Sequence, residues 1–118
     1  TLSDPELRYG TPVGNVVPEF YVWTVQFTED ISDSATGNAL TFTDNISSIS
    51  FNNNPPGMNF NSFQYISDSE YEIWYDIAPN SSQVTGYIIT VALQNIVDSA
   101  GLSYNGGSLT NTFSYPDP

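Results

Sequence analysis

Short runs of alternating hydrophobic and polar residues, separated by turn-forming residues, are the main pattern along this chain. The clearest run is 20–27, in which Tyr21, Trp23, Val25 and Phe27 share one face at a period of two. Helical periodicity is hard to find, whereas Gly, Pro, Asn and Asp interrupt the runs frequently. The pattern therefore predicts an all-β domain.

The runs predict seven to eight strands joined by short turns. The expected strands are 12–17 (an edge strand), 20–27, 39–44, 46–51, 58–66, 70–77, 86–97 and 109–115. Strands of this length and spacing favour an Ig-like antiparallel β-sandwich of two sheets. No internal repeat is visible, so residues 1–118 are interpreted as a single domain. Within it, 1–11 is an N-terminal linker or edge segment and 116–118 is a C-terminal linker.

The run 70–77 carries the most specific local feature, an outward tryptophan. The residues expected in the core are Tyr71, Ile73, Tyr75 and Ile77. The residues expected to face outward are Glu70, Glu72, Trp74 and Asp76. An exposed Trp between carboxylates could stack on a sugar, or it could contact a neighbouring copy. Alternatively, the loop 52–57 or the N-terminal segment covers Trp74, whereas Trp23 belongs to the core.

Composition removes several classes of function. The 118 residues include no Cys, no His and one basic residue, Arg8, against 13 Asp and Glu, which gives a formal charge of −12. Without His or Lys a hydrolase nucleophile lacks its usual base, and soft metals lack their ligands. Without a basic surface neither nucleic acid nor an anionic membrane is an expected partner, and no apolar run is long enough for membrane insertion. Hard cations bound by oxygen remain possible.

Two further features concern catalysis and glycosylation. Glu70 and Glu72 lie side by side on one face of a strand, which is not the arrangement of a glycosidase pair, so no enzymatic activity is expected. Asn45-Ile-Ser47 and Asn80-Ser-Ser82 match the N-glycosylation pattern. Ser, Thr and Asn make up nearly a third of the chain, and such an uncharged polar surface suits an extracellular protein.

Several blocks in order resemble the bacterial Ig-like repeats of large secreted surface adhesins. The blocks are Val25-Gln-Phe-Thr-Glu29, Tyr71-Glu-Ile-Trp-Tyr75 followed by Pro79, Ile89-Thr-Val91, Ile96-Val-Asp-Ser-Ala-Gly101, and Thr112-Phe113. The resemblance covers residues 22–115, most of the chain. It implies a spacer domain that holds a terminal binding module away from the cell, often stiffened by Ca²⁺ between repeats.

Strand directions in an Ig-type sandwich predict an acidic pole. The N-terminus, the end of strand 20–27 and the end of strand 86–97 should meet there. The carboxylates expected at this pole are those of Asp4, Glu6, Glu29, Asp30, Asp33 and Asp98. In a tandem array, Asp117 of the preceding copy would approach the same pole. Ca²⁺ is therefore a candidate ligand of the junction, and ordinary solvated loop acids are the alternative interpretation.

The leading hypothesis is a non-enzymatic extracellular structural domain, a spacer repeat or fibre subunit of a cell-surface adhesin whose partners are neighbouring copies or domains. One alternative is a subunit of an extracellular filament in which a terminal segment, 1–14 or 109–118, adds a strand to a neighbour's sheet. Another is a carbohydrate-binding module that binds glycan through Trp74.

Overall fold

The fold is built almost entirely from short strands. The computed structural model describes residues 1–78, 84–104 and 107–115. In these ranges the strands are β1 (Glu6–Tyr9), β2 (Glu19–Gln26), β3 (Ile31–Asp33), β4 (Ile46–Phe51), β5 (Asn59–Ser67), β6 (Glu70–Asp76), β7 (Val84–Leu93), β8 (Ile96–Asp98) and β9 (Ser108–Tyr115). A four-residue helix, α1 (Phe42–Asn45), precedes β4. Within the same ranges no helix has the length and apolar character needed to cross a bilayer.

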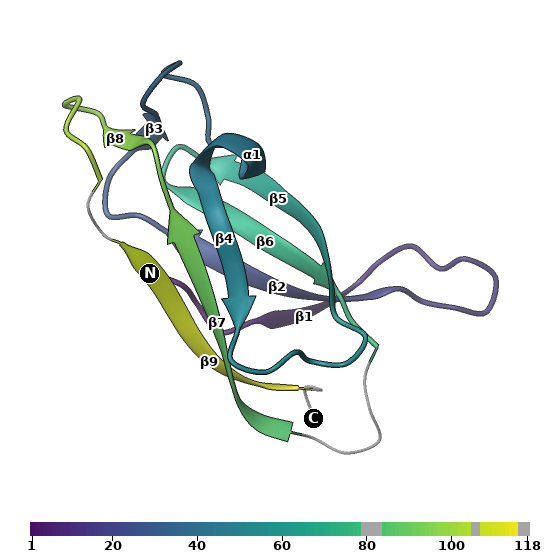
Figure 1. Cartoon of the computed structure of the whole chain (residues 1–118). Helices are drawn as coiled ribbons and strands as arrows, with labels where there is room; N and C mark the ends of the chain where they lie inside the picture. Colours follow the sequence, from purple (N-terminus) through teal and green to yellow (C-terminus); the bar gives the residue numbers. More distant parts are fainter. Residues whose placement is uncertain (79–83, 105–106, 116–118) are drawn as a thin grey trace.

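Two antiparallel sheets face each other (Figure 1). One sheet has the strand order β1-β2-β6-β5 and the other has the order β4-β7-β9, while β3 and β8 pair separately. The prediction of an all-β antiparallel sandwich is confirmed. If the strands of the two larger sheets are lettered in chain order, they pair as the strands of constant-type Ig domains do. The Ig-like assignment stays a prediction that this order favours.

The core lies between the two sheets and is rich in aromatic rings. Its fully buried large side chains include Tyr21 and Trp23 from β2, Tyr71 and Ile73 from β6, and Ile89 from β7, as their alternation predicts. The ring of Trp23 meets the ring of Phe113 edge to face, with centroids 5.1 Å apart. Its indole Nε1 donates a hydrogen bond of 3.2 Å to Asn111 Oδ1, so this buried polar atom is satisfied.

One edge strand of the four-stranded sheet is β1, and the expectation of a strand at 12–17 is wrong. Residues 10–18, which we call the arm, instead extend the β1–β2 hairpin away from the sandwich (Figure 1). At its tip, Val13 and Val16 exchange two backbone hydrogen bonds of 2.8 and 3.1 Å. Gly14 has a φ of 64°, as the first central residue of a type II′ hairpin turn requires. Prolines within the arm lack an N–H donor and so disfavour a regular strand.

The expected strand 39–44 is also wrong, because its second half forms α1. The side-chain oxygen of Thr41 accepts a hydrogen bond from the Asp44 backbone N–H at 3.2 Å, and Asn45 N donates to Thr41 O at 3.0 Å. Thr41-Phe-Thr-Asp44 matches a helix-capping pattern of Thr with an acid three residues later. This local cap outweighs the β-propensity of Phe42 and Thr43.

The run 86–97 was expected to form one strand, but it is interrupted between Leu93 and Ile96. Asn95 has a φ of 56°, a left-handed conformation that Asn tolerates better than most residues. The chain then leaves the β7 sheet, and β8 pairs with β3. These two three-residue strands bring the described strands to nine, above the expected seven to eight.

Candidate functional site

Three segments that are distant in sequence meet at one end of the sandwich, which we call the pole. The backbone nitrogen of Thr1 lies 2.6 Å from the carbonyl oxygen of Gln26, and Leu2 forms a bridge with Val25. Ile31 pairs with Asp98 in the β3–β8 ribbon. The N-terminus, the end of β2 and the segment that follows β7 therefore converge, as strand directions predict.

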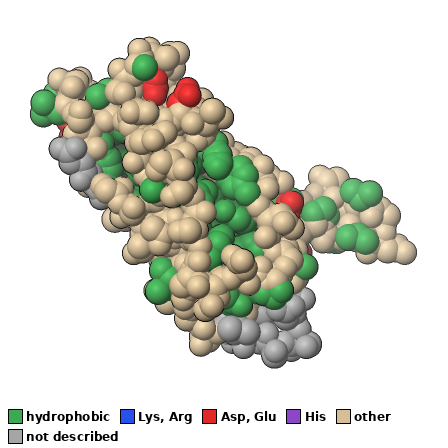
Figure 2. All heavy atoms as spheres, in the orientation of Figure 1, with side chains coloured by type: hydrophobic (Ala, Val, Ile, Leu, Met, Phe, Trp, Pro, Cys, Tyr) green, Lys and Arg blue, Asp and Glu red, His purple; other side chains and the backbone are tan. Residues whose placement is uncertain are grey.

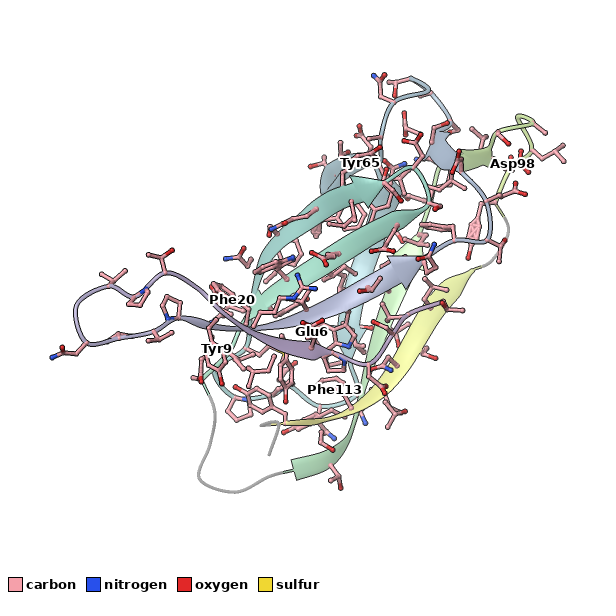
Figure 3. All side chains as sticks on the ribbon, turned by 180° about the vertical axis from the view of Figure 1, so that it is seen from behind. Glu6, Tyr9, Phe20, Tyr65, Asp98 and Phe113 are labelled. Atoms are coloured by element: carbon pink, nitrogen blue, oxygen red, sulfur yellow. The ribbon has the colours of Figure 1, made fainter. Side chains whose placement is uncertain are left out.

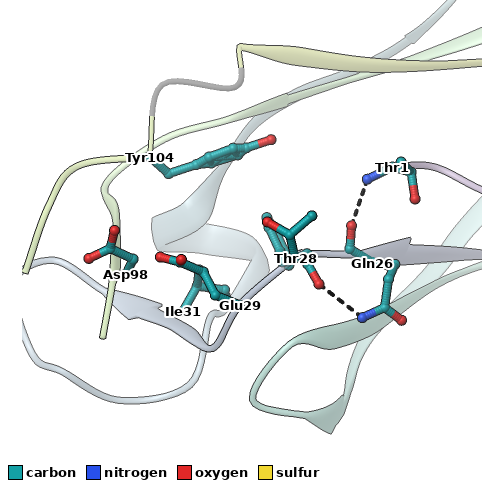
Figure 4. Close-up of a pocket in the computed structure, with 8 residues that line it drawn as sticks. Thr1, Gln26, Thr28, Glu29, Ile31, Asp98 and Tyr104 are labelled. Atoms are coloured by element: carbon teal, nitrogen blue, oxygen red, sulfur yellow. Dashed lines mark hydrogen bonds between the residues drawn. The ribbon is translucent and has the colours of Figure 1, made fainter. Parts of the chain in front are cut away.

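A cavity of about 200 Å³ lies at the pole and contains two carboxylates (Figure 4). Its lining residues are Thr1, Gln26, Phe27, Thr28, Glu29, Ile31, Asp98 and Tyr104. In Figure 4 the side chains of Glu29 and Asp98 lie next to one another and come from neighbouring segments. The ring of Tyr104 forms one wall, and it meets the ring of Phe27 edge to face at 5.4 Å.

The pKa values of the two carboxylates in the cavity are shifted in opposite directions. Backbone N–H groups of Ala100 and Leu102 each donate to Asp98 Oδ1 at 2.9 Å. The bond from Leu102 is the main cause that lowers the pKa of Asp98. A hydrogen bond with Asp98 and the charge of Asp98 raise the pKa of Glu29. Glu29 is therefore the group that retains a proton more readily, and a cation bound here would displace it.

The structure does not bring the other predicted ligands of the pole into this pair. Asp4 accepts a hydrogen bond of 2.8 Å from Asn111 Nδ2 on β9. Glu6 lies on β1 opposite Val22 and 3.4 Å from Arg8. Asp30 lines a separate hollow beside β3. Asp117 lies outside the described residues, and within them no three Asp, Glu, His or Cys side chains are grouped as a metal site.

Asp33 and Asn45 form a buried polar lock beside the pole, which sequence patterns did not indicate. Asn45 Nδ2 donates to Asp33 Oδ1 at 2.9 Å and to the carbonyls of Gln94 and Asn95 at 3.3 and 3.1 Å. Asp33 also accepts from the Thr36 hydroxyl at 2.9 Å. The hydrogen bond from Asn45, then that from Thr36, lowers the pKa of Asp33. The lock joins β3, α1 and the β7–β8 turn.

The same burial bears on the first of the two glycosylation patterns. Asn45 is fully buried, with 0% of its surface exposed, so the Asn45-Ile-Ser47 pattern is not an accessible glycosylation site in the folded domain. The second pattern, at Asn80, lies outside the described residues.

Trp74 faces outward on β6, and the N-terminal segment covers it. The Arg8 guanidinium lies 5.4 Å from the centroid of the Trp74 ring, a cation–π contact. Glu72 accepts hydrogen bonds from Arg8 Nη1 and Nη2 at 3.2 and 2.9 Å, and from Trp74 Nε1 at 3.0 Å. The bond to Glu72 is the main cause that raises the pKa of Arg8. Phe20 packs edge to face on the same ring, at 5.3 Å.

The two other acids that were expected on this face are Asp76 and Glu70. Asp76 accepts from Asn61 Nδ2 at 3.1 Å, and Glu70 pairs with Gln26 at the end of the sheet. Sugar binding by Trp74 stays a prediction, tested by glycan-array binding of the wild type and Trp74→Ala. Arg8 and Phe20 both contact the Trp74 ring, so part of its surface is already occupied.

Comparison of the chain with known protein families, curated proteins and solved structures finds no match. The resemblance to bacterial Ig-like repeats therefore stays a prediction. Inferences about function depend on the geometry of the pole, the outer face and the arm.

Proposed function

We propose that this domain is a non-enzymatic extracellular structural unit, a spacer repeat or fibre subunit of a cell-surface adhesin. The observation that carries the proposal is the placement of the two ends of the sandwich. Thr1 lies at the pole beside Gln26, whereas Tyr115 pairs with Val84 at the start of β7. Ten residues of β7 separate that end from the pole, a span of about 33 Å. Copies joined head to tail would therefore extend rather than fold back.

Firm attachment of the last strand supports a load-bearing role. The Tyr115 hydroxyl accepts a hydrogen bond from Ala78 N at 3.0 Å and lies 2.8 Å from the carbonyl oxygens of Pro56 and Ala78. The side chain itself is fully buried. In the middle of β9, Asn111 links Asp4 to Trp23. The terminal strand thus has polar and apolar contacts with both sheets.

Small-angle X-ray scattering from two copies joined head to tail tests the proposal. The expected result is an elongated particle whose largest dimension is close to twice that of one copy. A compact particle, in which the two copies lie side by side, would contradict the proposed spacer role. A single copy measured under the same conditions supplies the reference.

A calcium ion at the pole is the second part of the proposal. Glu29 and Asp98 supply two carboxylates, and main-chain carbonyls, water and Asp117 of a preceding copy would complete the oxygen shell. Ca²⁺ should raise the melting temperature of the two-copy chain relative to chelator, and Glu29→Gln should remove that increase. Asp30→Asn is the matched control, because Asp30 lies outside the cavity. Equal melting temperatures with Ca²⁺ and chelator would reject the calcium site.

Strand addition between copies is the second candidate function, and the free edges of the sheets favour it. Among the described residues, strands β5 and β9 each pair on one side only. The N-terminal donor segment is already paired in its own sheet through Leu2 and β1, so donation would require exchange of these contacts. Polymerisation that is lost when residues 1–9 are removed from a still-folded chain would support exchange. Unchanged polymerisation after trimming would exclude this segment as the donor.

A further inference from the structure

The arm presents apolar side chains that its own chain does not cover. Val13, Val16 and Val17 are 74%, 66% and 45% exposed, and Tyr9 at the base of the arm is 63% exposed. Figure 2 shows hydrophobic side chains on the projecting arm, with little other protein around them. Because these three valines stay exposed to water, they add little buried apolar surface to their own domain.

A second apolar surface lies along the free side of β5. Phe60, Tyr65 and Ile66 are 38%, 51% and 46% exposed, and we call these three residues the β5 margin. Behind the margin, the ring of Phe42 on α1 lies 4.4 Å from the ring of Phe60. Figure 2 shows hydrophobic side chains gathered where β5 and α1 lie beside β4. The sandwich is therefore open to solvent along this side.

The exposed large hydrophobic residues are concentrated at these two surfaces. Among the described residues, only Ile88 and Leu102 are exposed large hydrophobics outside the arm, its base and the β5 margin. The arm leaves the sheet beside β1, and the margin lies on the opposite edge strand (Figure 3). The strands β2 and β6 separate the two edges, and the arm points away from the sandwich. An arm therefore does not cover the margin of its own chain.

Charge favours a second copy of this chain as the occupant of the margin. The arm contains no charged residue, and neither does the whole segment 45–67, which includes β4 and β5. The rest of the chain carries a formal charge of −12, so two copies repel each other wherever their acidic surfaces meet. Asp68 lies beside the margin, where it accepts a hydrogen bond of 2.7 Å from the Tyr65 hydroxyl. Because the arm itself is uncharged, it can still approach the margin of an acidic copy without charge repulsion at the contact. A basic partner would instead bind to the acidic faces of the chain.

We propose that the arm of one copy packs on the β5 margin of a second copy. This lateral contact goes beyond the end-to-end arrangement, because it needs no covalent link between copies and no cation. Each copy has one arm and one margin that differ from each other, so the contact is heterologous and can continue into rings or filaments. The arm is shorter than the roughly 20–30 residues that each side of a standard interface contributes, so a single contact is weak.

Sedimentation equilibrium of the single-copy chain tests the contact. The wild type should self-associate between micromolar and millimolar concentration, more strongly at high salt, because salt screens the repulsion between copies. Val16→Asp in the arm and Ile66→Asp in the margin should each weaken association about tenfold or more. Leu102→Asp is the matched control, because it adds the same charge to an exposed apolar residue outside both surfaces. A mixture of Val16→Asp and Ile66→Asp should form a one-to-one dimer and nothing larger.

The absence of native cysteine allows a second measurement that does not depend on the stability of the charged variants. Val16→Cys mixed with Ile66→Cys should give disulfide-linked heterodimers in clear excess over Val16→Cys mixed with Leu102→Cys. A wild type that stays monomeric at millimolar concentration in high salt would overturn the proposal. Equal crosslinking in the two mixtures, or equal loss of association in Leu102→Asp, would also overturn it. Association that is unchanged by chelator keeps this result separate from the calcium test.

Discussion

Arg8 organises the outer face of the four-stranded sheet. Its guanidinium contacts both carboxylate oxygens of Glu72 and lies over Trp74, while the Glu72 side chain is only 9% exposed. A buried carboxylate requires such partners, because an unpaired charge in this position is costly. The alternation of 70–77 correctly predicts that Trp74 faces outward. It does not predict the partner, which depends on the position of β1 along β2.

Replacing Arg8 by Met tests this role. The substitution keeps an unbranched apolar stem but leaves Glu72 with Trp74 as its remaining side-chain donor. The free energy of unfolding should fall by about 1–3 kcal/mol, measured by urea denaturation. Glu6→Gln is the control, because Glu6 is an exposed partner of the same Arg8, and its loss should cost at most about 1 kcal/mol. Equal losses in the two variants would show that burial of Glu72 is not the cause.

Asp33 should contribute a pH-dependent part of the stability. Its hydrogen bonds with Asn45 and Thr36 lower its folded-state pKa below 3.8. A lowered carboxyl pKa stabilises the fold above the unfolded value, and this contribution is lost as pH falls through the folded pKa. Asp33→Asn should therefore lose less stability than the wild type between neutral pH and pH values below 3.8. Thermal melts across this range provide the measurement, and parallel curves for the two proteins would refute the assignment.

At the scale of elements, strands with a strict period of two could be predicted and segments controlled by local turn chemistry could not. Tyr21 and Trp23 alternate with outward residues, and β2 forms where expected. The arm was not predicted, because the valines in 12–17 suggested a strand. That segment could join a sheet only if a tertiary partner lay beside it. The helix α1 was missed because its cap at Thr41 acts against the β-propensity of its neighbours.

The candidate site, too, could be predicted only in part from the sequence. Strand directions predicted that Thr1, the end of β2 and Asp98 would meet, and they do meet at the pole. Directions do not specify side-chain partners, so they could not show that Asp4 bonds to Asn111 or that Glu6 lies beside Arg8. Those pairs depend on register between strands that are far apart in sequence.

The lock at Asn45 should be the most sensitive polar position of the β3–α1–β8 region. Asn45→Ala removes the donor to Asp33 and two carbonyls, and also the acceptor of the Thr41 backbone N–H. The buried groups left without partners should lower the free energy of unfolding by about 2–3 kcal/mol, measured by chemical denaturation. Asn61→Ala is the matched control, since Asn61 is exposed and its side chain donates a hydrogen bond to Asp76. Its effect should stay within about 0.5 kcal/mol, and a comparable loss would contradict the role of the lock.

At the scale of the whole molecule, charge is distributed unevenly over the two sheets. The strands β4, β7 and β9 contain no charged residue, whereas β1, β2 and β6 together carry acids and the single Arg8. Further acids lie in the segments around the pole. Copies of this chain should therefore avoid broad contact through the four-stranded sheet and the pole, unless a cation neutralises the pole. This distribution is compatible with copies arranged end to end, with a cation at each junction.

The distance between labels at the two outer ends of a head-to-tail pair is the most direct measurement of that arrangement. Exposed positions Ser34, at the pole, and Thr85, near the opposite end, can each carry one dye after replacement by Cys. With Ser34→Cys in the first copy and Thr85→Cys in the second, energy transfer should report a single distance well beyond that of the same two labels within one copy. Chelator should broaden the distribution if the junction binds Ca²⁺. A distance equal to or shorter than the single-copy value would contradict the account.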